Sequence, residues 1–313
     1  MKRKLSILAL CAFPLSGAAE GTGTTSQLLS TLVTAANSDD PIAVTQQAVE
    51  GYALTSLNNE LGNYSASLLN DRLKYLSLSV GRDRDEEFLE GMSVYGLYEN
   101  QNWFLFNQTS LINYDGRNTL NFGLGARHIN DPETIIVGAN AFYDFEFGSE
   151  HRRTGVGAEI LTSLLQMRAN YYIAATGERL VDGVYEEALS GNDLRLTYEL
   201  PYFYQSDFYL LTSNWYDGRG YSTFSREYGL TAEIAPSMIL ELASTSDRGR
   251  ADRFSGSLTY RFTLGSEPDR RVPRDGVFRF ALEPVREMLY EPVQRENRIM
   301  RKSVSLGVVV SGY

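Results

Sequence analysis

The feature that most constrains this chain is a strict alternation of side-chain character over segments of ten or more residues. In TIIVGANAFYDFEF, residues 134–147, the odd-numbered positions from Ile135 to Phe147 are all apolar or aromatic, and the other face ends in Asp144 and Glu146. Successive side chains of a β-strand point to opposite faces. Strands of soluble sheets usually have about five or six residues, whereas a strand that crosses a bilayer needs about nine to eleven. The pattern therefore predicts membrane-crossing strands with lipid on one face and a polar lumen on the other.

The alternation recurs about twelve times between residues 72 and 264. The candidate strands begin near Arg72, Phe88, Asn102, Arg117, Glu133, Arg152, Leu164, Asn192, Asp207, Thr223, Ser237 and Asp252. An even number of strands can close into a cylinder that leaves no unpaired edge in lipid. We therefore predict an all-β fold, an antiparallel transmembrane β-barrel of about twelve strands, preceded by short periplasmic helices and followed by a tail through the pore.

The connections between the candidate strands differ in length in a regular way. Counted from the first strand, the odd-numbered connections are longer than the even-numbered ones, and the longest is GERLVDGVYEEALSG, residues 177–191. Outer-membrane barrels have short periplasmic turns and longer outer loops. The helical segment before the barrel and the end of the last strand are therefore predicted on the periplasmic side.

The residues before and after the predicted barrel divide into separate segments. Residues 1–19 combine Lys2, Arg3 and Lys4 with an apolar run and small residues, which is the pattern of a secretory signal peptide. Residues 20–71 form a predicted periplasmic segment, with two amphipathic helices between residues 27 and 70. The barrel is predicted over residues 72–265, and a periplasm-side helix with a pore-threading tail over residues 266–313.

Composition limits the classes of function. The net charge is −10 and the pI about 4.9, which disfavours nucleic-acid binding, since phosphates require clustered basic residues. The only cysteine, Cys11, lies in the predicted signal peptide, and no Cys/His spacing suits a metal, so we expect no cofactor and no metal. His128 falls near a strand end, and His151 is interpreted as a solvated loop residue. We therefore expect no catalytic site, and we interpret Asp144 and Glu146 as partners of arginines rather than as an acid and base pair.

A set of charged residues falls on the polar face of the predicted strands. Because buried charges of one sign are costly and mixed signs can pair, we expect an internal ion-pair network in the lumen rather than an ion-selective ring. The predicted lumen-facing residues are Arg127, Asp144, Glu146, Glu159, Arg168, Arg195, Glu199, Glu233, Glu241, Arg253 and Arg261.

The tail is long enough to cross the membrane again. Residues 281–290 are compatible with a helix bounded by Pro284 and Pro292, and the rest is extended in character. Residues 298–313 span about 53 Å as an extended strand, against about 40 to 45 Å for a bilayer with its headgroups. We expect the tail to plug the barrel and to bring Tyr313 to the cell surface. The alternative placement makes SVSLGVVVSGY, residues 303–313, a strand of the barrel.

Six segments occur in an order that resembles the intimin and invasin family, the inverse autotransporters. They are NTLNFGLGARHI, IIVGANAFYDFEF, HRRTGVGAEI, MRANYYIAATG, LRLTYELP and LYEPVQRENRI, within residues 73–299. The resemblance implies a twelve-stranded translocator barrel whose linker threads back through the pore. Two departures stand out: the family's tryptophan corresponds to Leu161 or Thr162, and its asparagine-rich linker motif is reduced to RENRI. Immunoglobulin-like passenger repeats are not found, so we expect a translocator without a passenger.

The resemblance implies a membrane anchor and translocator in the outer membrane of a Gram-negative-type envelope, with surface display or adhesion as its role. The implied partners are outer-membrane lipids, the barrel-assembly machinery and, through residues 27–70, a periplasmic component or peptidoglycan. Two alternatives from other classes are a small pore gated by the tail and, less favoured, a barrel hydrolase. Conductance across a planar bilayer would separate the anchor from the pore.

Overall fold

The computed structural model describes residues 72–83, 86–200, 206–235, 237–247, 252–262 and 282–304. The predicted signal peptide, the predicted helices of residues 20–71 and the last nine positions, 305–313, lie outside these ranges. Within the described ranges, no helix has the length and apolar character needed to span a membrane.

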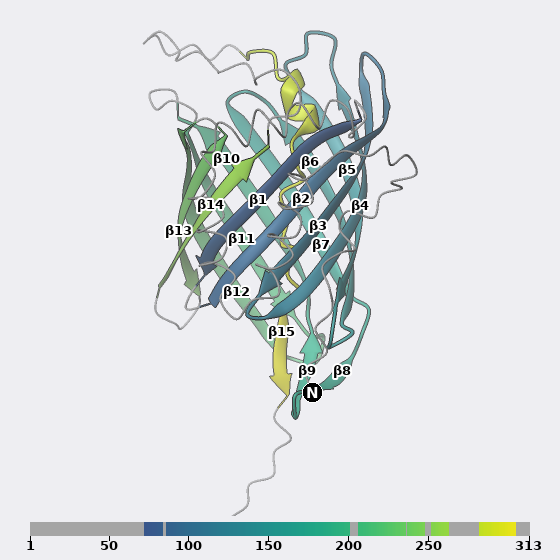
Figure 1. Cartoon of the computed structure of the whole chain (residues 1–313), viewed down its shortest axis with the longest axis vertical. Helices are drawn as coiled ribbons and strands as arrows, with labels where there is room; N and C mark the ends of the chain where they lie inside the picture. Colours follow the sequence, from purple (N-terminus) through teal and green to yellow (C-terminus); the bar gives the residue numbers. More distant parts are fainter. Residues whose placement is uncertain are drawn as a thin grey trace, which may run out of the picture.

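Twelve strands form one closed antiparallel barrel (Figure 1). Each begins within three residues of its predicted start, so the predicted barrel is confirmed. The strands are β1 (Leu73–Asp83), β2 (Glu86–Glu99), β3 (Trp103–Tyr114), β4 (Arg117–Ile129), β5 (Ile136–Glu146), β6 (Arg152–Leu161), β7 (Leu165–Ala174), β10 (Ser190–Glu199), β11 (Ser206–Tyr216), β12 (Ser222–Ala235), β13 (Met238–Asp247) and β14 (Arg253–Arg261).

The barrel closes where β1 pairs with β14. This seam runs from Ser77 opposite Arg261 to Asp83 opposite Ser255, and the Ser79 and Thr259 hydroxyls are bonded across it at 2.9 Å. Each barrel strand thus has a neighbour on both sides, which satisfies backbone groups that have no water to bond in lipid.

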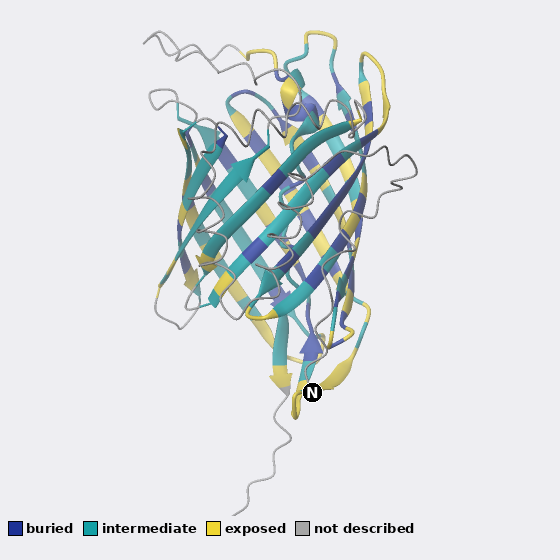
Figure 2. Cartoon of the chain, in the orientation of Figure 1, coloured by how far each residue is buried: buried dark blue, intermediate teal, exposed yellow. Residues whose placement is uncertain are grey.

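The side chains alternate between an apolar exterior and a polar interior, as predicted. In β7, Leu165, Met167 and Tyr171 are exposed, whereas the polar residues that alternate with them, Gln166, Arg168 and Asn170, are buried. The largest fully buried side chains include three arginines, Arg127, Arg153 and Arg168. Figure 2 shows exposed and buried positions in alternation along the strands. The interior therefore holds many charged side chains, and the outward faces of the strands are mostly apolar.

The longest connection is not the plain loop that the sequence suggested. It contains a hairpin, β8 (Glu178–Val181) and β9 (Val184–Ala188), whose turn places Asp182 and Gly183 at positive φ angles of 49° and 85°. A turn with two positive φ angles matches the twist of a two-residue hairpin and favours Asp-Gly. A strand from the tail, β15 (Arg301–Val304), pairs with β9 to make a three-stranded sheet.

The alternative placement of residues 303–313 in the barrel is wrong for its described part. Ser303 pairs with Glu186 of β9, and the barrel is already closed between β1 and β14. Of the predicted helix at residues 281–290, the structure shows one turn of 3₁₀ helix, η2 (Arg286–Tyr290), which begins after Pro284. Figure 1 places η2 and β15 at opposite mouths of the barrel.

Glycines in β4 make room for aromatic rings inside the barrel. A Cβ atom on Gly125 would lie 2.3 Å from the ring of Phe106, and one on Gly123 would lie 2.3 Å from the ring of Phe142. Both rings are buried, and Phe106 also lies under the Arg127 guanidinium, 4.8 Å from ring centroid to Cζ. These glycines are therefore packing positions.

We predict that Gly125→Ala lowers the free energy of unfolding by about 1 to 3 kcal/mol, since the added methyl overpacks a ring that cannot move. Urea unfolding of the barrel refolded into lipid vesicles measures this value. Gly177→Ala is the matched control, because a Cβ at Gly177 meets open space. Equal stability of the two variants would contradict the packing role.

Candidate functional site

The tail segment, residues 282–304, runs through the barrel from η2 at one mouth to β15 at the other (Figure 1). Inside the barrel, seven consecutive strands supply its polar contacts. The wall residues that hold it are Asp83 of β1, Glu90 of β2, Gln108 of β3, Arg127 of β4, Asp144 of β5, Arg153 of β6, and Asn170 and Tyr172 of β7.

The η2 end of the tail segment is an apolar plug. The buried side chains of Val285, Met288, Leu289 and Val293 pack with barrel residues Val94, Phe104, Phe106, Ile129, Ile136, Phe142 and Leu161. Outside the plug, Arg286 donates to Glu133 at 2.7 Å in the turn between β4 and β5. That hydrogen bond lowers the pKa of the Glu133 carboxyl below its ordinary value.

Arg127 caps the C-terminal end of the 3₁₀ turn η2. Its Nη1 donates to the carbonyl oxygens of Leu289 at 2.7 Å and Glu291 at 2.6 Å, and its Nε donates to Glu159 at 2.6 Å. The last carbonyls of a helix have no partner within the helix. Arg127 therefore satisfies them, while Glu159 neutralises its buried charge.

Two wall amides contact the tail backbone directly. Gln108 accepts from the Val293 N–H at 2.6 Å and donates to the Val293 carbonyl at 3.2 Å. Asn170 donates to the Gln294 carbonyl at 3.1 Å. A chain without regular secondary structure needs such partners for its buried polar groups. The wall thus supplies part of what a neighbouring strand would supply.

Asp144 is the centre of the site. Both of its oxygens accept from Arg295 of the tail segment, each at 2.7 Å, and one also accepts from Arg153 Nε at 2.8 Å. Arg295 lies over the ring of Phe142 at 4.2 Å, and Arg153 also donates to the Glu296 carbonyl at 2.5 Å. All three charged side chains are buried. One carboxylate thus joins two guanidinium groups, one from the wall and one from the tail segment.

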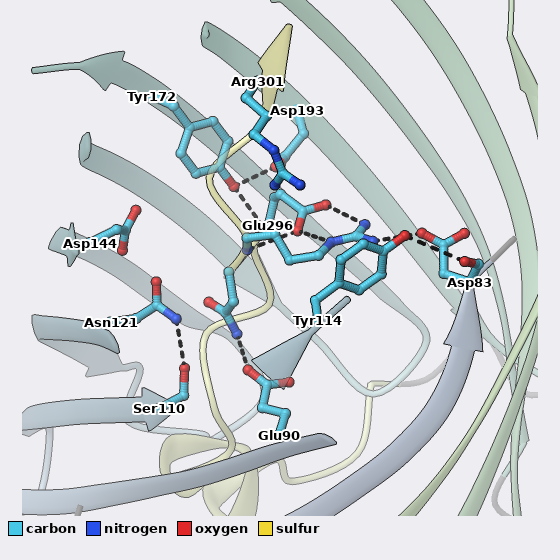
Figure 3. Close-up of polar contacts among 12 residues, drawn as sticks. Asp83, Glu90, Ser110, Tyr114, Asn121, Asp144, Tyr172, Asp193, Glu296 and Arg301 are labelled. Carbon is cyan, nitrogen blue, oxygen red and sulfur yellow. Dashed lines mark hydrogen bonds and ion pairs between the residues drawn. The ribbon is translucent and has the colours of Figure 1, made fainter. Parts of the chain in front are cut away.

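A second polar cluster follows directly along the tail segment (Figure 3). The Tyr172 hydroxyl accepts from the Glu296 N–H at 2.8 Å and donates to Asp193 at 2.6 Å. Asn297 donates to Glu90 at 2.6 Å. Arg298 bridges Glu296 at 2.8 Å and Asp83 at 2.6 Å, and it lies over the Tyr114 ring at 4.5 Å. These contacts hold this stretch to β1, β2 and β7.

At the mouth near β15, the tail segment is held by charge and by backbone pairing. Arg301 lies 3.5 Å from Glu186, and Lys302 lies 3.3 Å from Glu187 and also donates to Asp217. The bond from Lys302 is the first cause of the lowered pKa of Asp217, which falls to about 2 from an ordinary value of 3.8. Backbone pairing of β15 with β9 runs from Arg301 opposite Ala188 to Val304 opposite Tyr185.

The comparison with known proteins identifies the family. The model of the inverse autotransporter β-domain matches residues 26–297. The chain belongs to the inverse autotransporter family. It is 28% identical over 175 residues to a putative attaching and effacing protein homolog of Escherichia coli K12, covering 55% of this chain and 58% of that protein. It is 30% identical over 165 residues to invasin of Yersinia enterocolitica, covering 50% of this chain and 20% of invasin.

This inverse autotransporter chain spans only part of the length of the curated relatives that it matches. It spans 58% of the first relative's length, and its match to the adhesin YeeJ of Escherichia coli K12, 27% identical over 53% of this chain, covers 8% of that protein. A solved structure, "Unveiling the Mechanism Behind the in-meso Crystallization of Membrane Proteins", has a TM-score of 0.60 at 18% identity, covering 74% of this chain and 100% of that one. Family and fold make the chain an outer-membrane anchor and translocator barrel, among adhesin-type relatives rather than enzymes.

The structure brings some of the predicted charged residues of the inverse autotransporter lumen together around the tail segment. Arg127 pairs with Glu159, and Arg168 lies 3.7 Å from both Glu159 and Glu291. Glu146 accepts from Arg117 and from the Ser149 hydroxyl, and it lies 3.8 Å from Arg301.

The other predicted residues lie on β10 to β14, away from the contacts that hold the tail segment. Arg195 stacks on the Tyr209 ring at 3.5 Å, and Tyr209 donates to Glu241 at 2.6 Å. In two further pairs, Arg261 lies 3.8 Å from Glu233, and Arg253 donates to Asp247 at 2.5 Å. Glu199, at the end of β10, is half-buried.

Several residues of the site were not predicted from the sequence. They are Asp83, Glu90, Arg117, Arg153, Tyr172, Asp193, Arg295 and Arg298. The segment RENRIMRK, residues 295–302, is rich in basic residues. This composition could have identified the tail residues, because a basic segment suits an acidic lumen. The wall residues share the polar face of their strands, but the pattern alone does not show which of them meets the tail.

The interpretation of His151 as a solvated loop residue is wrong. Its side chain is fully buried, because the short turn after β5 folds back so that the Glu146 N–H donates to the His151 carbonyl at 2.9 Å. Its Nδ1 lies 3.1 Å from the Thr176 hydroxyl, and burial lowers the pKa of the ring. His128 packs edge-on against Trp103, with centroids 4.8 Å apart. Among the described residues, no group of three or more potential ligands could hold a metal.

We predict that Asp144→Asn lowers the free energy of unfolding by about 3 to 5 kcal/mol, because two buried guanidinium groups lose their counter-charge. Urea unfolding in lipid vesicles measures the change. Glu178→Gln is the control: its ion pair with Arg219 is exposed, and its loss costs less than about 1 kcal/mol. A loss for Asp144→Asn as small as that of the control would rule out the central role of this carboxylate.

The Asp217 contact predicts how acid affects β15. A carboxyl whose folded pKa is depressed stabilises the fold above its ordinary pKa, and that contribution is lost as the pH falls through the folded value. The link to Lys302 is therefore expected to be intact above pH 4 and to be lost as the pH falls towards 2.

Spin labels at Ser303→Cys and Asp115→Cys report on this contact by their distance distribution. We expect a narrow distribution at pH 5 and a broad one near pH 2. Asp217→Asn should broaden it at pH 5 already. Identical distributions at pH 5 and near pH 2 in the doubly labelled chain that keeps Asp217 would contradict the link between Asp217 and Lys302.

Proposed function

We propose that this inverse autotransporter barrel carries its own C-terminal chain outward through the pore and holds that chain at the cell surface. The tail segment carries the proposal, because its contacts extend from Glu133 at one mouth to β9 beyond the other. A small solute pore would not need its lumen crossed by its own chain. An anchor that displays the chain beyond β15 does need that chain to cross its lumen.

The direction of the tail segment follows from the connections. The hairpin β8 and β9 joins β7 to β10 and lies at the mouth with the longer connections, which in outer-membrane barrels is the outer one. Since β15 pairs with β9, the tail segment leaves towards the outside. The η2 end then lies at the periplasmic mouth.

Two kinds of contact retain the tail segment under this proposal. The apolar plug and the Asp144 cluster resist withdrawal, since moving either would unpair buried groups. The pairing of β15 with β9 uses backbone groups, so it places few demands on the sequence that follows. A chain of any adhesive character could therefore be displayed beyond Val304.

Surface display and adhesion complete the proposal, and relatives named invasin and intimin support them. We include insertion by the barrel-assembly machinery, and contact of residues 27–70 with peptidoglycan or another periplasmic component, as partners expected for such an anchor. The alternative of a pore gated by its tail requires the seven-strand set of contacts to open, which makes it the less favoured function.

We predict opposite labelling of cysteines at the two ends of the tail segment. Ser303 and Glu287 are both exposed, and Cys11 is the only native cysteine. On intact cells, a membrane-impermeant maleimide should label Ser303→Cys but not Glu287→Cys. After the outer membrane is permeabilised, both should be labelled.

Comparing the two cysteine positions also defines the result that would contradict the proposal. Labelling of Glu287→Cys but not Ser303→Cys on intact cells would reverse the direction of the tail segment and overturn the proposal. Asp115→Cys, at the turn between β3 and β4, is the control for the outer surface, since Asp115 and Ser303 should be labelled alike.

A further inference from the structure

The lipid-facing surface of β10 to β13 carries a group of polar residues near the outer mouth. Six outward residues of β10 to β13 form this polar patch: Asn192, Thr212, Asn214, Arg226, Ser244 and Ser246. Register makes them neighbours, since Arg226 lies opposite both Thr212 and Ser246, and Asn214 lies opposite Asn192. Membrane barrels normally present an apolar band to lipid. The polar patch therefore needs a partner that lipid tails cannot provide.

The alternation of β12 shows that Arg226 faces outward. The next residue, Glu227, accepts from the Tyr209 hydroxyl inside the barrel at 2.9 Å. Tyr228 and Leu230, two and four residues beyond Arg226, are 46% and 42% exposed. Because Arg226 shares their face, its guanidinium lies on the outside of the barrel.

Arg226 lies at the depth of the outer membrane–water interface. It lies between Phe224 and Tyr228 on the outward face, four residues after β12 begins at Ser222. Nearby, the outward hydroxyls of Tyr171 and Tyr216 are bonded at 2.9 Å. Aromatic side chains gather where lipid headgroups meet the acyl chains. Arg226 is therefore placed at the level of the headgroups of the outer leaflet.

The donors of the polar patch lack protein partners within the described residues. Arg226 lies over the Phe224 ring at 5.3 Å, and no described carboxylate lies within ion-pair distance of its guanidinium. Nor do the side chains of Thr212, Asn214 and Ser246 bond to another described residue. An arginine at such a site offers a fork of N–H donors that matches phosphate. The hydroxyls and amides around it suit a ligand rich in oxygen.

We propose that the polar patch binds the headgroup of a phosphorylated glycolipid in the outer leaflet. Arg226 pairs with a phosphate, with its orientation fixed by Phe224, while Asn192, Asn214 and Ser246 bond to sugar hydroxyls. A simple anionic phospholipid would be satisfied by the arginine alone and would leave the surrounding amides and hydroxyls unpaired. The polar patch therefore favours a sugar phosphate over a diacylglycerol phosphate.

The test uses the full chain in detergent micelles, with diphosphoryl lipid A as the probe and native mass spectrometry as the readout of bound lipid. We expect Arg226→Gln to weaken binding about tenfold, which is the loss of one charge-assisted contact. Arg179→Gln is the matched control, since Arg179 is also exposed but lies on the hairpin β8. It should bind as the unsubstituted chain does.

Two further arms separate phosphate, sugar and charge. Lipid A without its phosphates should bind as weakly to the unsubstituted chain as the phosphorylated probe binds to Arg226→Gln. Phosphatidylglycerol should bind weakly and should be insensitive to Asn214→Ala with Ser246→Ala, whereas diphosphoryl lipid A should lose affinity in that variant. Arg226→Lys keeps the charge without the fork and serves as the second variant if Arg226→Gln does not fold.

Three results would overturn the proposal. They are equal binding of diphosphoryl lipid A to Arg226→Gln and to Arg179→Gln, equal binding of phosphatidylglycerol and diphosphoryl lipid A, and equal binding of the dephosphorylated and phosphorylated probes. The polar patch lies outside the lumen, so failure of these measurements leaves the labelling of the tail segment unchanged. Placement of the polar patch in the outer leaflet rests on the orientation in the proposed function, whereas a failure of lipid binding with the labelling as expected overturns the lipid site alone.

Discussion

A guanidinium taken out of water must be paired with an anion or with carbonyl groups, and in this barrel that requirement joins the wall to the tail segment. Arg153 alone could have been paired by Asp144, because their strands are neighbours and these residues lie opposite each other. Asp144 also accepts both hydrogen bonds from Arg295, so the carboxylate joins Arg153 of β6 to a tail residue that lies 151 positions after Asp144 in the chain. The position of the tail follows from this shared charge.

The interior has two regions with different contents. On β1 to β7 the polar groups hold the tail segment, each strand through at least one side chain. On β10 to β14 they bond within the wall, as Tyr209 does with Glu227 and Glu241. Glycines such as Gly125 let the aromatic rings of the first region pack closely beside the apolar plug. One part of the barrel thus grips the tail, while the other closes the cylinder.

Charged and polar side chains on the exterior of the barrel also require partners. Lipid-facing positions are apolar along most strands, so the few polar groups there need a specific reason. The hairpin β8 and β9 uses its acidic residues to hold Arg301 and Lys302 of β15. The polar patch around Arg226 lies on the barrel wall between the aromatic residues Phe224 and Tyr228, and it is the site that we propose for a lipid headgroup.

Alternation of side chains is a local property, and for this reason the sequence determined the twelve strands and the face that each turns to lipid. Connection lengths predict which mouth is the outer one. Pairing between distant residues is not local: Arg295 meets Asp144, and Arg298 meets Asp83, only because the barrel closes around a returning chain. The burial of His151 and the hairpin within the longest connection also depend on contacts between distant segments. Only the tertiary structure decided these features, since a period of two specifies which face a charge lies on but not which charge it meets.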